Sequence, residues 1–189
     1  MRRFVVLPAL LLALAFNPSA LAEEFASLRQ PAIGPVAVGV VEIGPELTEK
    51  AEEYGPRELN RLTRQIEGAL MDALMDAGRF SEIDQPGANI LLVVIEDAQP
   101  NRPTFRQLSM RPNLSARSLS LGGARVTAIL TDPAGEELGR FAYSWRTPSI
   151  DQSQYATVWA DADTAFDRFA RLIARELREQ QAETAETAG

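Results

Sequence analysis

The stretch LSLGGARVTAILTDPAGEELGRFAYSWR, residues 119–146, decides the fold class because it predicts a β-hairpin. Residues 119–131 alternate partly between apolar and polar side chains, as a half-buried strand does. Asp132-Pro-Ala-Gly135 has the residue order of a type I turn, with Asp first, Pro second and Gly fourth. The returning strand, residues 137–146, places Phe141, Tyr143 and Trp145 on one face.

Upstream of the hairpin the pattern predicts further strands and one helix. Residues 36–43 are rich in Val and Ile and predict a strand, residues 80–83 a short edge strand, and residues 89–96 a central strand. Because residues 90–95 are apolar on both faces, we expect that strand to be covered on both sides or strongly buried. Pro56 and Gly78 bracket an apolar stripe at a spacing of three to four residues, which predicts a helix over residues 56–77.

Downstream, a second apolar stripe predicts a helix from near Ser153 to about Glu179. The expected order is β-α-β-β-β-β-α. The predicted fold class is therefore α/β of the α+β type, with two helices packed on one mixed, largely antiparallel sheet of four to five strands. Residues 97–118 contain three prolines and show no periodicity, so we expect a long loop there.

The N-terminus has the three parts of a secretory signal peptide. Arg2 and Arg3 precede the apolar run of residues 4–16, and Ala20-Leu-Ala22 forms an A-x-A cleavage site. We therefore expect residues 1–22 to be removed on export. The expected organisation of the rest is an irregular lead-in over 23–34, one α/β domain over 35–179 and a disordered tail over 180–189.

The composition excludes several classes of function. The chain of 189 residues has no His and no Cys, which excludes Ser-His-acid triads, Cys-His pairs and ordinary zinc sites. No metal or other cofactor is expected, and without Cys the chain cannot be lipidated, so we expect it in the periplasm or secreted. Cleavage after Ala22 would leave 17 basic and 26 acidic residues, a formal net charge of −9. That balance argues against nucleic-acid binding.

Short motifs in the C-terminal half resemble a known protein family. They are Gly122-Gly-Ala124, Thr131-Asp-Pro-Ala-Gly-Glu-Glu-Leu138, Trp159-Ala-Asp161 and the run AFDRFARL over residues 165–172. They are similar to domain of unknown function family 3313, which consists of predicted bacterial envelope lipoproteins. The resemblance covers roughly residues 120–178 and implies an envelope location and a compact α/β fold. It implies no activity, and this chain departs from the lipoprotein pattern because it has no Cys.

The most unusual feature is a segregation of charge. Between Ala98 and Thr131 there is no acidic residue but there are five arginines: Arg102, Arg106, Arg111, Arg117 and Arg125. Four of them lie in the loop of residues 98–118 beside Phe105. Since Arg suits bidentate contacts with carboxylates and phosphates, we hypothesise that Arg102, Arg106, Arg111, Arg117 and Phe105 dock an anionic envelope partner. The alternative is that these arginines pair with acidic helices of their own domain.

Four other features of the sequence bear on function. Asp161, Asp163 and Asp167, with Glu96 and Asp97, form carboxylate clusters that are typical of a solvated helix face or, alternatively, of an acid/base pair. The aromatic residues Phe141, Tyr143, Trp145, Tyr155 and Trp159 are typical of core packing or, alternatively, of a sugar-binding groove. Lys50, the only Lys, is expected to be solvated, and Gly122-Gly123 to mark a close backbone approach.

These patterns favour a periplasmic, non-catalytic binding or accessory module of the bacterial cell envelope. The alternative from another class is a carboxylate-dependent hydrolase that acts on an envelope glycan. A concave site with two carboxylates at catalytic spacing would distinguish the hydrolase. The oligomeric state and the strand order stay open at this point.

Overall fold

The computed structural model describes residues 22–32, 34–153 and 156–187. The predicted signal peptide, apart from Ala22, and Tyr155 lie outside the described residues. Among the residues described, none of the helices is both long and apolar enough to cross a membrane.

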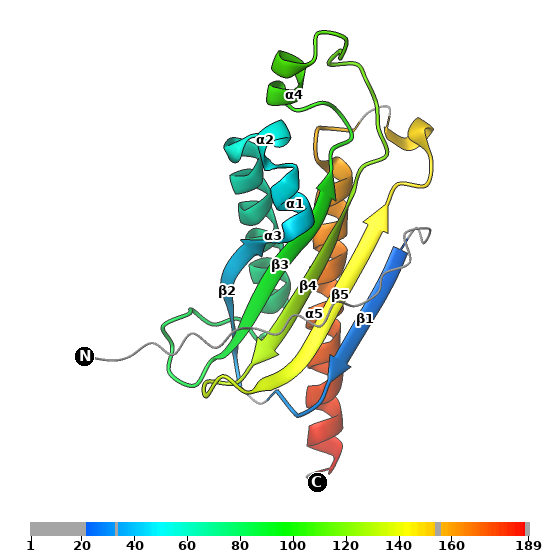
Figure 1. Ribbon diagram of the computed structural model, residues 1–189. Coiled ribbons are helices and arrows are strands. Elements are labelled where there is room, and N and C mark those ends of the chain that lie inside the picture. The colour runs from blue at the N-terminus through cyan, green and yellow to red at the C-terminus, as the bar shows by residue number, and fades with distance from the viewer. Residues whose placement is uncertain (1–21, 33, 154–155, 188–189) are drawn as a thin grey trace, which may run out of the picture.

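One mixed sheet of five strands forms the front layer of the molecule (Figure 1). Its strands are β1 (Ala22–Leu28), β2 (Val36–Ile43), β3 (Asn89–Gln99), β4 (Gly123–Thr131) and β5 (Glu137–Arg146), in the spatial order β1-β5-β4-β3-β2. All neighbours run antiparallel except β2 and β3, which are parallel because α3 connects them as a crossover. This agrees with the predicted class of one mixed, largely antiparallel sheet with helices packed on it.

Two long helices form the back layer: α3 (Pro56–Asp76) and α5 (Ala160–Thr187). They pack against each other, and both lie behind the sheet in Figure 1. In α3 the stripe that predicted the helix faces inward, and Leu62, Ile66, Leu70 and Leu74 are buried. In α5 the buried stripe includes Phe166, Phe169, Ile173 and Leu177. The core therefore lies between one face of the sheet and this helix pair.

The second face of β3 is not covered as predicted. Leu91, Val93 and Ile95 face the helices and are buried, whereas Leu92 on the opposite face is 43% exposed. Of the two alternatives predicted for this strand, cover on both sides was therefore wrong, whereas most of its residues are buried or half-buried. Apolar residues on both faces of a strand also occur where a sheet keeps an apolar open face.

The hairpin forms as predicted, from Gly123 opposite Arg146 to Thr131 opposite Glu137. In its turn the Gly135 amide donates to the Asp132 carbonyl (3.0 Å), and the Asp132 side chain accepts from Ala134 (2.8 Å). The first strand begins at Gly123 rather than Leu119, because Ser120 and Gly122 hydrogen-bond outside the ladder, to Asn101 and Thr147.

At both ends of the chain the structure corrects the sequence predictions. The segment predicted as an irregular lead-in, residues 23–34, contains most of β1, which pairs with β5 along its whole length. The segment predicted as a disordered tail continues α5 to Thr187, and Gln180 accepts a hydrogen bond from the Ala32 amide (2.9 Å). The predicted strand at 80–83 reduces to one bridge between Val36 and Phe80.

Short helices lie between the predicted elements. The polar segment before α3 forms α1 (Pro45–Glu49) and α2 (Ala51–Tyr54), and the predicted loop of residues 97–118 contains α4 (Phe105–Met110). A 3₁₀ turn, η1 (Ile150–Ser153), precedes α5, which begins at Ala160 rather than near Ser153. In Figure 1, α4 projects above the end of the sheet where β3 and β5 end and β4 begins.

Candidate binding surface

Asn101 anchors the base of the arginine-rich loop to the start of α5. Its side chain is fully buried, donates to the Asp161 carboxylate and accepts from the Asp161 amide (3.0 Å). Asp161 also accepts from the Thr147 hydroxyl at the end of β5 (2.5 Å). A Cβ on Gly122 would clash with the Asn101 side chain, so the predicted close backbone approach occurs here. The loop therefore leaves the sheet from a fixed base.

Helix α4 is fixed at its own N-terminus by a capping box. The Thr104 hydroxyl accepts from the Gln107 amide (3.2 Å), and the Gln107 side chain accepts from the Thr104 amide (2.9 Å). Side chains of α4 also reach α2: Arg106 Nε donates to the Glu52 carbonyl (2.7 Å), and Gln107 Nε2 to the Glu53 carboxylate (2.8 Å). The short helix is thus held rigidly against its neighbour.

The structure places the four predicted docking arginines in different settings. Arg102 donates to the carbonyls of Ala156 (2.7 Å) and Ala116 (3.3 Å), and Arg111 pairs with Glu53 (2.9 Å). Arg106 and Arg117 are exposed, and within the described residues the Arg117 side chain makes no hydrogen bond or ion pair. Pairing with the domain's own acids therefore occurs at Arg111, and also at Arg125, which contacts Glu46 (2.5 Å).

Phe105 is the most exposed of the large apolar side chains. It is 85% exposed at the first turn of α4, and Met110 at the last turn is 55% exposed. Phe105 and Met110, together with Arg106, Arg111 and Arg117, define what we call the tip surface.

A polar cleft of about 370 Å³ lies between α4 and the α1–α2 segment. Arg102 and Arg111 line it together, whereas Phe105, Arg106 and Arg117 do not. Lys50 also lines this cleft and pairs with the buried Asp97 carboxylate (2.5 Å), so the prediction of a solvated Lys50 was wrong. The structure therefore brings three cationic side chains to one cleft, of which sequence reasoning singled out two.

Tyr54 forms part of the cleft wall. Burial, together with the negative charges of Asp97 and Glu53, raises the pKa of its hydroxyl, so it stays protonated. Its ring packs edge-on against Trp159, with the ring centroids 5.3 Å apart. Glu53 is the only carboxylate among the described residues that line the cleft.

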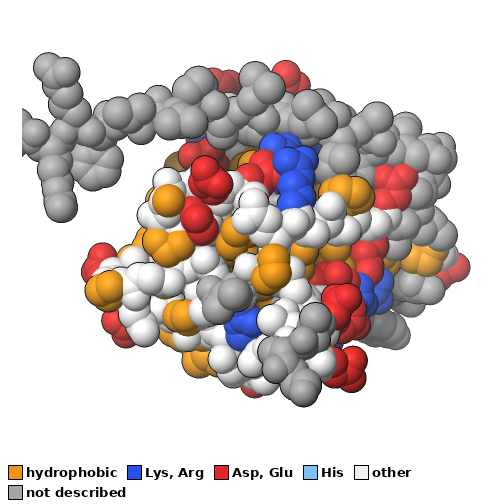
Figure 2. Space-filling model, turned by 90° about the horizontal axis from the view of Figure 1, so that it is seen from below, with side chains coloured by type: hydrophobic (Ala, Val, Ile, Leu, Met, Phe, Trp, Pro, Cys, Tyr) orange, Lys and Arg blue, Asp and Glu red, His pale blue; other side chains and the backbone are white. Residues whose placement is uncertain are grey.

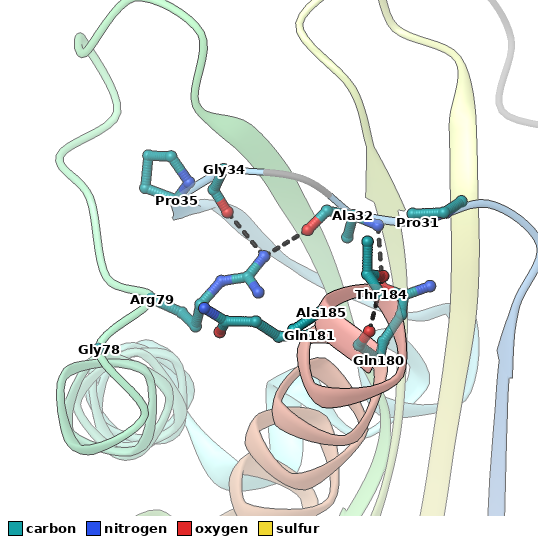
Figure 3. Close-up of a pocket in the computed structure, with 10 residues that line it drawn as sticks. All are labelled: Pro31, Ala32, Gly34, Pro35, Gly78, Arg79, Gln180, Gln181, Thr184 and Ala185. Carbon is teal, nitrogen blue, oxygen red and sulfur yellow. Dashed lines mark hydrogen bonds between the residues drawn. The ribbon is translucent and has the colours of Figure 1, made fainter. Parts of the chain in front are cut away.

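A second cavity, of about 520 Å³, lies at the opposite end of the molecule (Figure 3). The buried Arg79 guanidinium donates there to the carbonyls of Ala32 (2.5 Å), Gly34 (2.7 Å) and Leu177 (3.4 Å). Burial lowers the pKa of Arg79, but a guanidinium remains charged at neutral pH. Arg79 therefore holds the β1–β2 connection against α5.

The carboxylate clusters are separated by the fold. Asp161 belongs to the loop anchor, Asp97 to the ion pair with Lys50, and Glu96 accepts from Thr127 (2.7 Å). Burial raises the pKa of Asp163 to about 6, and no group of three possible metal ligands occurs among the described residues.

Three of the four described aromatic residues of the predicted set are buried in the core. Trp159, Phe141 and Tyr143 are buried, and the Trp159 indole donates to Glu58 (2.7 Å). Trp145 stacks under the Arg168 guanidinium, 4.6 Å from the ring centroid. Since Trp159 is fully buried, it offers no face to a sugar ring.

Comparisons with known proteins show a fold likeness only. No family model matches the chain, and no curated protein matches it, so the resemblance to family 3313 stays a prediction. A PelC variant dodecamer from Paraburkholderia phytofirmans is similar with a TM-score of 0.52 and 11% identity, over 81% of this chain and 97% of that chain. A protein from Xanthomonas campestris of domain of unknown function family 330 has a TM-score of 0.45 and 11% identity, over 82% and 91% of the two chains.

Proposed function

We propose that this protein is a periplasmic, non-catalytic binding or accessory module of the cell envelope, and that it docks through the tip surface. The single observation that carries the proposal is the exposure of Phe105, 85% of whose surface faces solvent on a helix with anchored ends. A large apolar side chain in water contributes nothing to folding. Loops that a rigid scaffold holds in place often carry binding residues.

The loop architecture supports this proposal. Asn101 fixes the base of the loop, the capping box fixes the start of α4, and Arg106 and Arg111 tie α4 to α2. A preorganised surface loses less conformational entropy on binding than a flexible loop would.

The charges of the loop indicate an anionic partner. Arg106 donates to a backbone carbonyl, which carries no formal charge, so this bond does not neutralise its guanidinium group. Arg117 adds a second exposed cation, while Glu53 offsets Arg111. The tip surface therefore combines apolar contact with net positive charge.

The test measures association with isolated bacterial cell envelopes. The chain from Glu23 onward, which contains every described helix and strand except for Ala22, is mixed with envelopes, and the bound fraction is measured by sedimentation. We expect Phe105→Ser and Arg117→Ser each to reduce the bound fraction severalfold.

Matched controls are available far from the tip. Met75→Ser removes a side chain that is 50% exposed on α3, and Arg171→Ser removes an exposed arginine on α5. The proposal would be contradicted if the tip variants bound to envelopes as well as these controls. It would also be contradicted if none of the proteins bound.

A further inference from the structure

The apolar residues of the tip surface lie outside the cleft. Phe105 and Met110 are exposed on α4, and neither lines the cleft that lies between α4 and α2. In Figure 1, α4 and the loop that follows it project furthest at their end of the molecule. A few apolar side chains on such a projection fit a soft surface into which they can insert.

Cationic side chains lie beside these apolar ones. Arg106 is the second residue of α4, Arg111 follows the last residue of the helix, and Arg117 lies in the same loop. An apolar residue that inserts between headgroups, flanked by guanidinium groups that contact phosphates, is the arrangement of an interfacial membrane anchor.

The opposite end of the molecule shows both red acidic and blue basic side chains in the view from below (Figure 2). Two turns at this end carry Glu82, Asp84, Asp132 and Glu136, and the β1–β2 connection adds the exposed Arg29, which pairs with Glu137. Acidic side chains therefore predominate in the turns of this end.

The distance between the two ends decides how far the acidic turns act on the tip surface. Helix α3, with 21 residues, runs between the two ends and is about 30 Å long at 1.5 Å per residue. That length exceeds the Debye length of about 8 Å at physiological ionic strength. The acidic side chains of the far end are thus screened from a surface that contacts the tip surface.

We infer that the partner of the tip surface is the anionic face of a phospholipid bilayer, into which Phe105 inserts while Arg106, Arg111 and Arg117 contact lipid phosphates. This inference rests on the function proposed above and names the chemistry of its partner. It assigns no role to the cleft or to the cavity beside Arg79.

The test uses the absence of native Cys, which allows a single environment-sensitive label. Phe105→Cys and, as the matched control, Met75→Cys are prepared in the chain from Glu23 onward and labelled with a polarity-sensitive fluorophore. Circular dichroism confirms that each labelled variant is folded. The probes are protein-free vesicles of phosphatidylglycerol or of phosphatidylcholine alone.

With phosphatidylglycerol vesicles we expect a blue shift and brighter emission from the label at position 105 and no change at position 75. Phosphatidylcholine vesicles and high salt should abolish the shift, because the arginine contribution is electrostatic. For the unlabelled chain, Phe105→Ser should weaken partitioning into phosphatidylglycerol vesicles about tenfold, as expected for the loss of one inserted aromatic side chain.

An unchanged emission at position 105 with phosphatidylglycerol vesicles would overturn the inference, and so would equal shifts at positions 105 and 75. If the tip variants still lose binding to whole envelopes, the partner is an envelope protein or polymer. The proposed function would then stand without this inference. If the tip variants lost binding neither to whole envelopes nor to vesicles, both the proposed function and this inference would be overturned.

Discussion

At the scale of single residues, a few buried polar side chains fix how distant segments meet. Asn101 and Asp161 join the arginine-rich loop to α5, and Arg79 joins the β1–β2 connection to the same helix. Asn101 and Arg79 are buried and Asp161 is half-buried, so each would be costly without its partners. They therefore specify the arrangement at both ends of the molecule.

Asp163 is a residue that the fold does not satisfy fully. It lies half-buried near the start of α5, and its Oδ1 has no hydrogen-bond partner among the described residues. Burial and the nearby Asp167 raise its pKa to about 6, although Arg61 and a hydrogen bond from Gln65 act in the opposite direction. The folded protein thus holds this proton more tightly than the unfolded chain, where the pKa is about 3.9.

The sign of the pH effect follows from this difference. As pH rises from about 4 to about 6, the unfolded state ionises first, so the Asp163 contribution to the free energy of unfolding decreases. We expect Asp163→Asn to be more stable than the wild type by about 1 kcal/mol at pH 7, after allowance for partial solvent screening, and nearly equal to it at pH 4.

Urea denaturation of both proteins between pH 4 and pH 8 measures this effect. Asp72→Asn, which changes an exposed carboxylate on α3, is the control for the loss of one negative charge. A constant difference between Asp163→Asn and the wild type across this range would contradict the expected titration.

Sequence reasoning found the tip residues but not the residues that position them. Phe105 and the arginines were visible because charge segregation is a local pattern. Asn101 and Lys50 were missed because their partners, Asp161 and Asp97, lie 60 and 47 residues away in the sequence. A single sequence does not show which distant polar residues pair.

At the scale of elements, the sequence at the start of α4 has the pattern of a helix N-terminus, although this segment was predicted as a loop. Thr104-Phe-Arg-Gln107 has the S/T-x-x-E/Q spacing of a capping box, and prolines on either side obscured it in a segment predicted as loop. The hairpin was predictable because its turn residues are adjacent. Strand β1 was not, since it is held by pairing with β5, more than 100 residues away.

Loss of the cap should loosen α4 without unfolding the domain. Thr104→Ala removes the hydroxyl that accepts from Gln107, at a cost of about 1 kcal/mol to the helix end. We expect trypsin to cleave after Arg106 severalfold faster, with a much smaller change in Tm, because α4 buries none of its residues.

Ser109→Ala is the matched control in the same helix, because its hydroxyl only donates to the Arg106 carbonyl on the exposed side. It should leave the cleavage rate close to that of the wild type. Equal cleavage rates for Thr104→Ala and the wild type would show that contacts with α2, rather than the cap, hold α4.

At the scale of the whole molecule, the protein is a two-layer structure with both long helices on one face of the sheet. This layering leaves the opposite face of β3 partly exposed. The hydrophobic content of the strand did not show which of its two faces is buried and which is exposed. Adjacent residues of β3 test the layering directly, because successive side chains of a strand face opposite sides.

Leu91 is fully buried against the helices, whereas Leu92 is 43% exposed on the other face. We expect Leu91→Ala to lower the free energy of unfolding by about 3 kcal/mol, through lost burial and a residual cavity. Leu92→Ala should cost about 1 kcal/mol or less, because its side chain already contacts water. Urea denaturation of the two variants measures the contrast, and a comparable cost at both positions would mean that a further layer covers this face in solution.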